Sequence, residues 1–455
     1  MTSNYAAMWR WHFYAGVVVI PLLLVLAATG LVMAVGNALS PYHHRDLFYV
    51  SEDDVAIAPS AQVATVIARY PKASVAVYVP PRASNRSAEV VISAADDASL
   101  PPWQQPTLSV FVDPYRAEIV GTLDRATTYY AIAKKIHGSL MLGQAGDYIV
   151  EAGASLAVLL VLTGICLWFP RNQTGGWLTP RRMPGGRSFL RSVHGSLGFW
   201  LAPILLFFLI SGLAWTPIWG EKLTQAWSAF PAERMRAPTS TASHKHQNHG
   251  GKIAPWVLEQ TALPASTPLD RVAEGSGVGL DDVVSYARKA GFDTFRVILP
   301  KGDMGAWTIS AVTMSGDVSD PRLDRTLHMD RYSGEVLADV DYSQYSIPGK
   351  LMATSIAIHQ ADIGSINLAF NVLLCVGVIS LAVTACLMWW KRRPKMAGYR
   401  LMPPGKVSGR TATVVMMLLL VVSTLFPLAF AVLCLVMILD ILLVSRLAIL
   451  RNLLK

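Results

Sequence analysis

Apolar residues gather in four long stretches that separate two large, more polar segments of the chain. The stretches fall within residues 1–36, 148–170, 192–218 and 365–391. An apolar helix of about 20 residues crosses the ~30 Å hydrocarbon layer of a bilayer. The pattern therefore predicts four transmembrane helices, of which the first has too long an apolar core to be a cleaved signal peptide.

The C-terminal tail, residues 411–455, is also mostly apolar and has Pro427 near its middle. It is too long for one untilted crossing of a membrane. We expect two more helices with a turn at Phe426–Pro427, and a single kinked helix is the alternative. The chain is thus predicted to be a polytopic α-helical membrane protein with about six transmembrane helices.

The two large polar segments, residues 37–147 and 219–364, share one order of predicted elements. Each has a helix with apolar residues at helical spacing, then strands with alternating or β-branched residues, then a turn that begins at an aspartate. We therefore expect two α+β domains outside the membrane. The predicted helices are 61–70 and 279–290, the strands are 74–79, 88–93, 108–112, 295–299 and 306–311, and the turns are 113–121 and 330–337.

Four histidines recur at matched places beside the predicted spans. His12 precedes two glycines by four and eighteen residues, and His194 repeats both intervals. His137 and His359 each precede a span that carries a threonine and a tryptophan at equal spacing (Thr163, Trp168, Thr384 and Trp389). The chain therefore contains a two-fold internal repeat of span, extramembrane domain, histidine and span.

The composition agrees with a membrane protein, because 15% of the residues are charged and 53% are hydrophobic, whereas soluble domains carry about 25% charged residues. The net charge of +9 is concentrated in two short loops, 171–191 and 392–410, which contain basic residues and no acidic ones. Such loops stay in the cytoplasm. We expect a bacterial inner-membrane protein with both termini in the cytoplasm and both large domains in the periplasm. Nucleic-acid binding is the weaker interpretation of the basic charge.

This orientation places the four histidines at two depths in the membrane, two near each face. His12 and His194 lie at the cytoplasmic edge, and His137 and His359 lie at the outer edge, where an amphipathic helix at 126–141 delivers His137. Two neutral imidazoles from facing helices are what a six-coordinate haem iron needs, so the sequence predicts two b-type haems, one near each face. Cations close by in sequence are expected to hold the haem propionates (Arg10, Arg191, Lys134 and Lys135).

Two other interpretations of the histidines were weighed. A single histidine at a membrane edge is more often a hydrogen-bonded structural residue than a ligand. Zinc would need more than two protein ligands in each layer. The recurrence of four histidines at matched places favours haem.

The remaining polar residues of interest carry less specific signals. Residues 232–276 are rich in Pro, Ser, Thr and Gly, which predicts a loosely packed linker. The histidines within it, 244–249, and the pair His43 and His44 are interpreted as solvated, with weak metal binding as the alternative. His328 is interpreted as structural. Asp440 marks either a polar contact within the last span or an acid at the membrane edge.

Three motifs carry a resemblance to a known family. The Asp-x-Tyr-x-x-Glu turns at Asp113 and Asp330, the stretch 137–168 and the pattern from His12 to Gly16 resemble the PepSY-associated transmembrane family of iron-regulated membrane proteins. The resemblance covers about residues 1–394, and the terminal helix pair is typical of some members. One copy departs from the pattern, because Ala385 stands at the position that corresponds to Gly164.

The resemblance implies a dihaem inner-membrane reductase that passes electrons across the membrane to a periplasmic Fe(III)-siderophore and releases Fe(II). Some relatives carry a fused flavin and nicotinamide reductase. This chain has no G-x-G-x-x-G run after a strand, so quinol or a cytoplasmic reductase is the expected electron donor, and lipid is the other partner. The alternatives are a PepSY-type membrane binding or regulatory protein and a carrier of iron complexes or haem.

Overall fold

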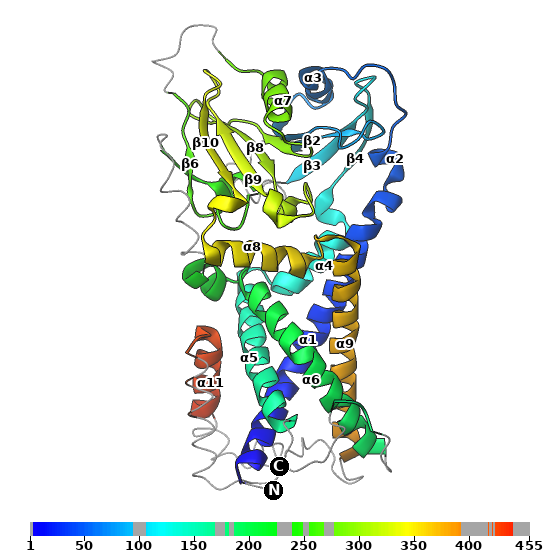
Figure 1. Ribbon diagram of the computed structural model, residues 1–455, viewed down its shortest axis with the longest axis vertical. Helices are drawn as coiled ribbons and strands as arrows, with labels where there is room; N and C mark the ends of the chain where they lie inside the picture. The colour runs from blue at the N-terminus through cyan, green and yellow to red at the C-terminus, as the bar shows by residue number, and fades with distance from the viewer. Residues whose placement is uncertain are drawn as a thin grey trace. The chain divides into compact units, whose positions relative to one another are not determined.

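The computed structural model of the protein describes a chain of two compact units (Figure 1). The helical unit comprises Met1–Met33, Ala133–Leu223 and Ala369–Lys455, and the sheet unit comprises Ala34–Ile132 and Thr224–Leu368. Each unit is described by itself. The described residues are 3–93, 106–168, 178–181, 186–224, 239–248, 254–267, 277–392, 417, 421 and 424–439.

Four helices among the described residues are long and apolar enough to cross a membrane, and each coincides with a predicted span. They are α1 (Ser3–His43), α5 (Gln144–Trp168), α6 (Gly186–Leu213) and α9 (Gly364–Arg392). α1 continues past the predicted end at residue 36. α6 ends before the predicted residue 218, because a turn leads into the π-helical segment η3 (Pro217–Thr224), whose proline cannot continue the α6 hydrogen-bond ladder.

The helical unit is built around direct packing of α5 against α6, and α11 (Pro427–Leu439) packs against α5. Lipid tails are as apolar as leucine, so close packing rather than exclusion from water holds such helices together. Gly195 of α6 leaves room for the ring of Trp168 of α5. α11 begins at the proline where the sequence predicts a turn, whereas Asp440 and most of 411–423 lie outside the described residues, so six spans remain a prediction.

A carboxyl group lies fully buried within α5. The Glu151 side chain is 0% exposed, and its two oxygens accept hydrogen bonds from the backbone N–H groups of Ile218 at 2.9 Å and Trp219 at 3.0 Å. These N–H groups belong to the first turn of η3, where a helix has no partners of its own for them. Glu151 therefore ties η3 to α5.

We expect the Glu151→Ala variant to lose about 3 kcal/mol of stability, because it leaves two buried N–H groups unpaired. Glu151→Gln should lose less, since the amide oxygen can still accept one of the two bonds. Thermal unfolding in detergent measures both effects. Ser155→Ala, which removes another buried polar group of α5, is the matched control. Equal unfolding temperatures for Glu151→Ala and this control would contradict the expectation.

The sheet unit contains an eight-stranded antiparallel sheet with the strand order β10-β9-β8-β7-β1-β2-β3-β4. The first large polar segment supplies β1 to β4 and the second supplies β7 to β10. The strands are β1 (Ser74–Val79), β2 (Ala88–Ser93), β3 (Thr107–Val112), β4 (Ile119–Leu123), β7 (Arg296–Ile298), β8 (Trp307–Ala311), β9 (Arg325–Met329) and β10 (Val336–Asp341).

The two halves join through the central strands, where Val77 lies opposite Ile298 and Tyr78 opposite Val297. The two domains expected from the sequence are therefore halves of one sheet. The physical reason is that β1 and β7 would each be an unpaired edge in a separate domain, and pairing satisfies the backbone groups of both. Periodicity along one strand does not reveal which strand lies beside it.

Helices α3 (Pro59–Arg69) and α7 (Leu280–Lys289) lie side by side on one face of the sheet (Figure 1). Each buries apolar residues one turn apart, such as Val63 and Val66 of α3 and Val283 and Ala287 of α7. Together with the strand residues that face them, these form the main core of the unit. Helical and strand periodicity in the sequence predict this packed layer correctly.

The two aspartate turns have the same geometry. The backbone N–H of Asp113 donates to the Glu118 carbonyl at 2.8 Å, and that of Asp330 donates to the Glu335 carbonyl at 2.8 Å. Each turn has a residue with positive φ at the same place, Ala117 at 52° and Gly334 at 73°. The turns connect β3 to β4 and β9 to β10, as the repeat in the sequence predicts.

The second half of the sheet unit carries additional elements from the region predicted to be a linker. β5 (Thr239–Ser243), η6 (His244–Gln247) and β6 (Ala262–Pro264) are ordered and contact the sheet, so the prediction of a loosely packed linker is wrong for these residues. The other described elements are α2 (Arg45–Phe48), η2 (Arg125–Thr127), α4 (Tyr129–Ser139), η8 (Thr313–Ser315), η9 (Pro321–Leu323), η10 (Tyr342–Gln344) and α8 (Ile347–Gln360).

Candidate functional site

The histidine His12 of α1 is held from one side by a turn of α5. Its Nδ1 lies 3.1 Å from the Leu160 carbonyl oxygen and 3.1 Å from the Thr163 hydroxyl. The Thr163 hydroxyl is close to the same carbonyl, at 2.9 Å, and so completes a small polar cradle in an apolar helix. The cradle fixes the orientation of the imidazole ring.

His194 of α6 repeats this arrangement with α9. Its Nδ1 lies 3.1 Å from the Leu381 carbonyl oxygen and 3.0 Å from the Thr384 hydroxyl. The pair α6 and α9 thus makes the same contacts as the pair α1 and α5, as the two-fold repeat predicted from the sequence leads one to expect. The copies use the same residue types at the same spacing, a leucine followed three residues later by a threonine.

His137 of α4 meets a third cradle, in α1. Its Nδ1 lies 3.0 Å from the Thr29 hydroxyl, and the Leu26 carbonyl also bonds to the ring. A fourth turn with this pattern runs from Phe208 to Ser211, where the serine hydroxyl donates to the Phe208 carbonyl at 3.2 Å. In the sequence the threonines are visible only as marks of the predicted repeat, and their contact with histidine is not. The sequence signal that the four turns share is an apolar residue followed three positions later by a serine or threonine.

The cradles determine which nitrogen carries the proton. A carbonyl oxygen can only accept, so the Nδ1 of each cradled neutral imidazole carries the hydrogen and Nε2 carries the lone pair. For His12 and His194, no hydrogen-bond partner of Nε2 occurs among the described residues. A neutral imidazole with Nδ1–H bonded to a carbonyl is the usual arrangement of a metal-ligating histidine. The residues present therefore fit an axial ligand of haem iron.

Glycines give the imidazole rings of two histidines room to approach the neighbouring helix. A Cβ atom on Gly164 would lie 3.1 Å from the His12 ring, and one on Gly30 would lie 3.5 Å from the His137 ring. The cradle of His194 carries Ala385 after Thr384, at the position that corresponds to Gly164, so this room is not required in every copy. Gly195, which follows His194 in the sequence, gives room to the Trp168 ring and not to an imidazole.

The structure brings two of the four predicted ligands together. His12 and His194 lie within electrostatic range of each other in the helical unit. His359 lies in the last turn of α8, within the sheet unit, so its pairing with His137 stays a prediction. In the described part of the chain, no group of three or more His, Cys, Asp or Glu side chains is arranged to bind a metal ion. A haem iron takes only two imidazoles from the protein, so this absence does not bear on the haem prediction.

The four predicted propionate cations have ordinary surroundings. Arg10 donates to the Tyr14 hydroxyl at 3.1 Å and lies over its ring, 5.3 Å from the centroid. Lys134 and Lys135 are exposed on α4, and Arg191 is exposed on α6. These positions permit contact with an anionic group, and their assignment to propionates stays a prediction.

One prediction about histidines is wrong. His244 is not solvated but 1% exposed, and its Nε2 lies 2.9 Å from the Nε2 of His328, which is also 1% exposed. Sequence composition favoured a solvated loop because the strand opposite, β9, is distant in the chain. His246 is partly buried in a cap with Ser243, and position 249 lies outside the described residues.

The buried histidine pair forms a directed chain of hydrogen bonds. His244 Nδ1 donates to the Thr261 carbonyl at 2.9 Å, so its Nε2 accepts from His328 Nε2–H. His328 Nδ1 then accepts from the Thr308 hydroxyl at 2.9 Å, which in turn accepts from Gln247 Nε2 at 2.6 Å. The chain is satisfied only when both imidazoles are neutral. It joins residues 239–248 and 254–267 to the sheet.

We expect acid to release this segment. Burial lowers the pKa of His244 to about 4, and burial together with repulsion from His244 lowers the pKa of His328 further. An unfolded histidine titrates near 6.5, so this stability is present above pH 6.5 and is lost as the pH falls toward about 4. Limited proteolysis of 239–267 between pH 7 and pH 4.5 measures the release. His244→Gln should be cleaved at both pH values, and unchanged protection of the wild type at pH 4.5 would contradict the expectation.

A family model described as "PepSY-associated TM region" matches residues 9–392. A search of curated proteins found no match.

Proposed function

Because the chain belongs to the family of the PepSY-associated TM region, we propose that it is a dihaem inner-membrane reductase that passes electrons to a periplasmic Fe(III)-siderophore. The iron would leave as Fe(II). The observation that carries this proposal is the repeated cradle, in which a carbonyl and a hydroxyl hold histidine Nδ1 at His12, His194 and His137. Three copies of one arrangement are hard to attribute to unrelated structural histidines.

The residues of this chain have defined roles in the proposal. The cradles at Thr163 and Thr384 hold His12 and His194 as Nδ1–H tautomers, which would leave both Nε2 lone pairs available to one inner haem iron. His137, held by Thr29, and His359 would form the outer pair. When bound, haem supplies a one-electron carrier whose potential depends on its two imidazole ligands and on burial.

The proposal includes the direction of electron flow. Quinol or a cytoplasmic reductase would supply electrons on the inner side, and the ferric siderophore would accept them at the outer pair. The basic loops 171–191 and 392–410 support a cytoplasmic position for both termini. A topology reporter fused near residue 80 should be active only in the periplasm, and activity only in the cytoplasm would reverse the orientation.

The function is tested on detergent-purified protein by its visible spectrum and haem content. We expect b-type absorbance and two haems per chain. Thr163→Val and Thr384→Val should each weaken retention of the inner haem by about 10-fold or more, because outer hydrogen bonds orient a ligating imidazole. Thr216→Val is the matched control, since its hydroxyl bonds to the Leu213 carbonyl three residues back.

The alternatives give different results in the same preparation. A protein without haem absorbance would favour a PepSY-type binding or regulatory protein. Reconstituted vesicles that take up an iron complex without forming Fe(II) would favour a carrier. Reoxidation of the pre-reduced protein by a ferric siderophore, with Fe(II) trapped by a ferrous chelator, would support the reductase.

A further inference from the structure

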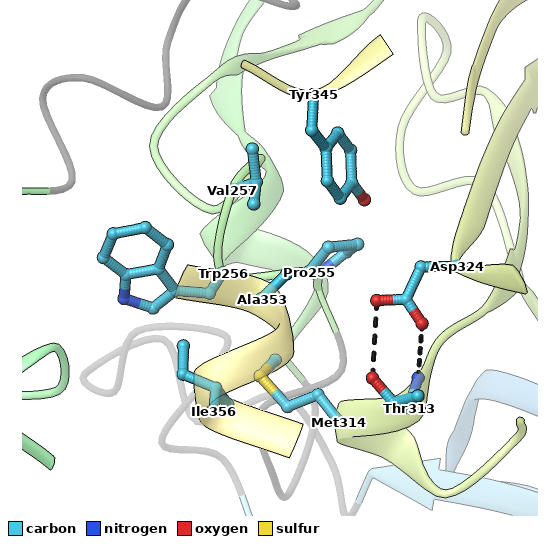
Figure 2. A pocket seen from close by; sticks show the side chains of 9 residues that line it. All are labelled: Pro255, Trp256, Val257, Thr313, Met314, Asp324, Tyr345, Ala353 and Ile356. Atoms are coloured by element: carbon cyan, nitrogen blue, oxygen red, sulfur yellow. Dashed lines mark hydrogen bonds between the residues drawn. The ribbon is translucent and has the colours of Figure 1, made fainter. Parts of the chain in front are cut away.

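A small cavity lies in the sheet unit beneath α8 (Figure 2). Ala353 and Ile356 of α8 form one wall, and Trp256, Met314, Asp324 and Tyr345 line the rest. The space available to a water-sized molecule is ≈ 10 Å³. That is about the space that one water molecule needs. The cavity is therefore suited to a single small polar occupant.

The Tyr345 hydroxyl lacks a partner although its side chain is buried. Tyr345 is 3% exposed, and its hydroxyl forms no hydrogen bond with any described residue. Figure 2 shows the hydroxyl pointing toward the side of the cavity where Asp324 lies. Buried polar groups are nearly always hydrogen-bonded, to protein or to an ordered water. This hydroxyl therefore indicates an occupant between Tyr345 and Asp324.

The Asp324 carboxyl is the second polar group of the cavity and is 4% exposed. It accepts hydrogen bonds from the Thr313 backbone N–H at 2.8 Å and the Thr313 hydroxyl at 3.4 Å, and it forms no ion pair within the described chain. Buried carboxyls without a cation favour the protonated form. Burial accordingly raises the pKa of Asp324 to about 7.

The surroundings of Asp324 add negative charge only. The carboxyls of Asp317 and Asp320 act on Asp324, and that of Asp341 acts on Tyr345. Asp317 is neutralised in part by its ion pairs with two arginines, Arg82 and Arg296. The walls from α8 and from residues 255–257 contribute apolar side chains to the cavity. Apart from the two hydrogen bonds from Thr313, no described group around the cavity stabilises an ionised Asp324.

We propose that this cavity is a proton-binding site in which one water molecule joins the Tyr345 hydroxyl to the Asp324 carboxyl, and that its protonation state controls how firmly α8 is seated on the sheet unit. A protonated Asp324 donates to the water and presents no charge to the apolar wall of α8. Loss of the proton leaves an uncompensated charge against Ala353 and Ile356, so α8 opens more often. The inference is independent of whether α8 carries a haem ligand.

The direction of the pH effect follows from linkage. While α8 is packed against the sheet unit, Asp324 holds its proton up to about pH 7, whereas an exposed aspartate releases its proton near pH 3.8. Seating is therefore strongest below pH 3.8 and weakens as the pH rises to about 7. Above that pH, the carboxyl is ionised in both states and the effect is constant. The buried histidine pair has the opposite pH dependence, so the two sites are separable.

Hydrogen exchange of the full-length protein, followed by mass spectrometry of peptides from 347–360, tests the proposal. After correction for intrinsic exchange, the wild type should open on the order of tenfold more often at pH 8 than at pH 5.5. Asp324→Asn should abolish this difference. Asp293→Asn, at an exposed carboxyl of the same unit, is the matched control and should keep it.

Tyr345→Phe distinguishes the proposed site from a merely structural carboxyl. The variant removes the hydroxyl that stabilises the ionised form through the water, so the midpoint of the pH effect should move to higher pH. An unchanged midpoint would overturn the bridged site. A pH effect in Asp324→Asn equal to that of the wild type would overturn the proposal as a whole.

The wild type offers a test that does not depend on the folding of any variant. With 13C-labelled aspartate, the infrared difference spectrum between pH 6 and pH 8 should show a protonated carboxyl band that disappears at the higher pH. Deuterium should shift this band. Absence of the band at pH 6 would overturn the proposal.

Discussion

Replacement of His12 by alanine should remove one of the two proposed haems, and replacement of His194 should remove the same one. The reason is that the two imidazoles lie within electrostatic range in one unit and are held by equivalent cradles. Haem whose iron is bound by one axial imidazole is held far less firmly than haem whose iron is bound by two. We expect each variant to keep about half of the haem absorbance, measured on purified protein together with the reduced-minus-oxidised spectrum.

The pairing is tested by combining variants. The double variant His12→Ala and His194→Ala should lose no more haem than either single variant, whereas His12→Ala combined with His137→Ala should lose both haems. His43→Ala, at an exposed histidine on the same helix as His12, is the control and should keep both. Loss of one and the same haem from the single variants His12→Ala and His137→Ala would contradict the pairing.

Replacement of His359 by alanine should separate reduction of the inner haem from delivery of electrons to the substrate. The inner pair does not depend on His359, so the remaining haem should still be reduced by the donor. Reoxidation of the pre-reduced protein by a ferric siderophore should fall to the background rate, measured by stopped-flow absorbance with a ferrous chelator present. Gln360→Ala, in the same helical turn of α8, is the matched control.

Two outcomes would count against this prediction. Reoxidation of His359→Ala at the wild-type rate would remove the outer pair from the electron path. Loss of inner-haem reduction in the same variant would show that His359 supports the helical unit as a whole. The unfolding temperature of the variant in detergent distinguishes a local effect from a general loss of stability.

Much of the fold could be predicted from local patterns. The four apolar stretches determine α1, α5, α6 and α9, because a bilayer requires about 20 apolar residues in a helix and a soluble core does not. Period-two and helical spacing determine the strands and the helices α3 and α7. The intervals around His12 and His194 determine the internal repeat and thereby the candidate ligands.

The cradles were only partly visible in the sequence. Thr163 and Thr384 were recognisable as repeated positions, but the atoms that contact them belong to His12 and His194 on other helices. A hydroxyl residue in a transmembrane helix can bond to its own backbone, as Thr163 also does. Only the packing of two helices shows that the same hydroxyl also orients an imidazole.

The sequence by itself determined the membrane-spanning helices, the strands, the turns and the histidines that repeat. The tertiary structure decided which distant strands pair, so that β1 and β7 unite two expected domains in one sheet. It also decided that His244 meets His328 and that Asp324 lies in a cavity with Tyr345. The physical reason is that local periodicity fixes which face of an element is apolar, whereas burial of a polar group depends on partners far along the chain.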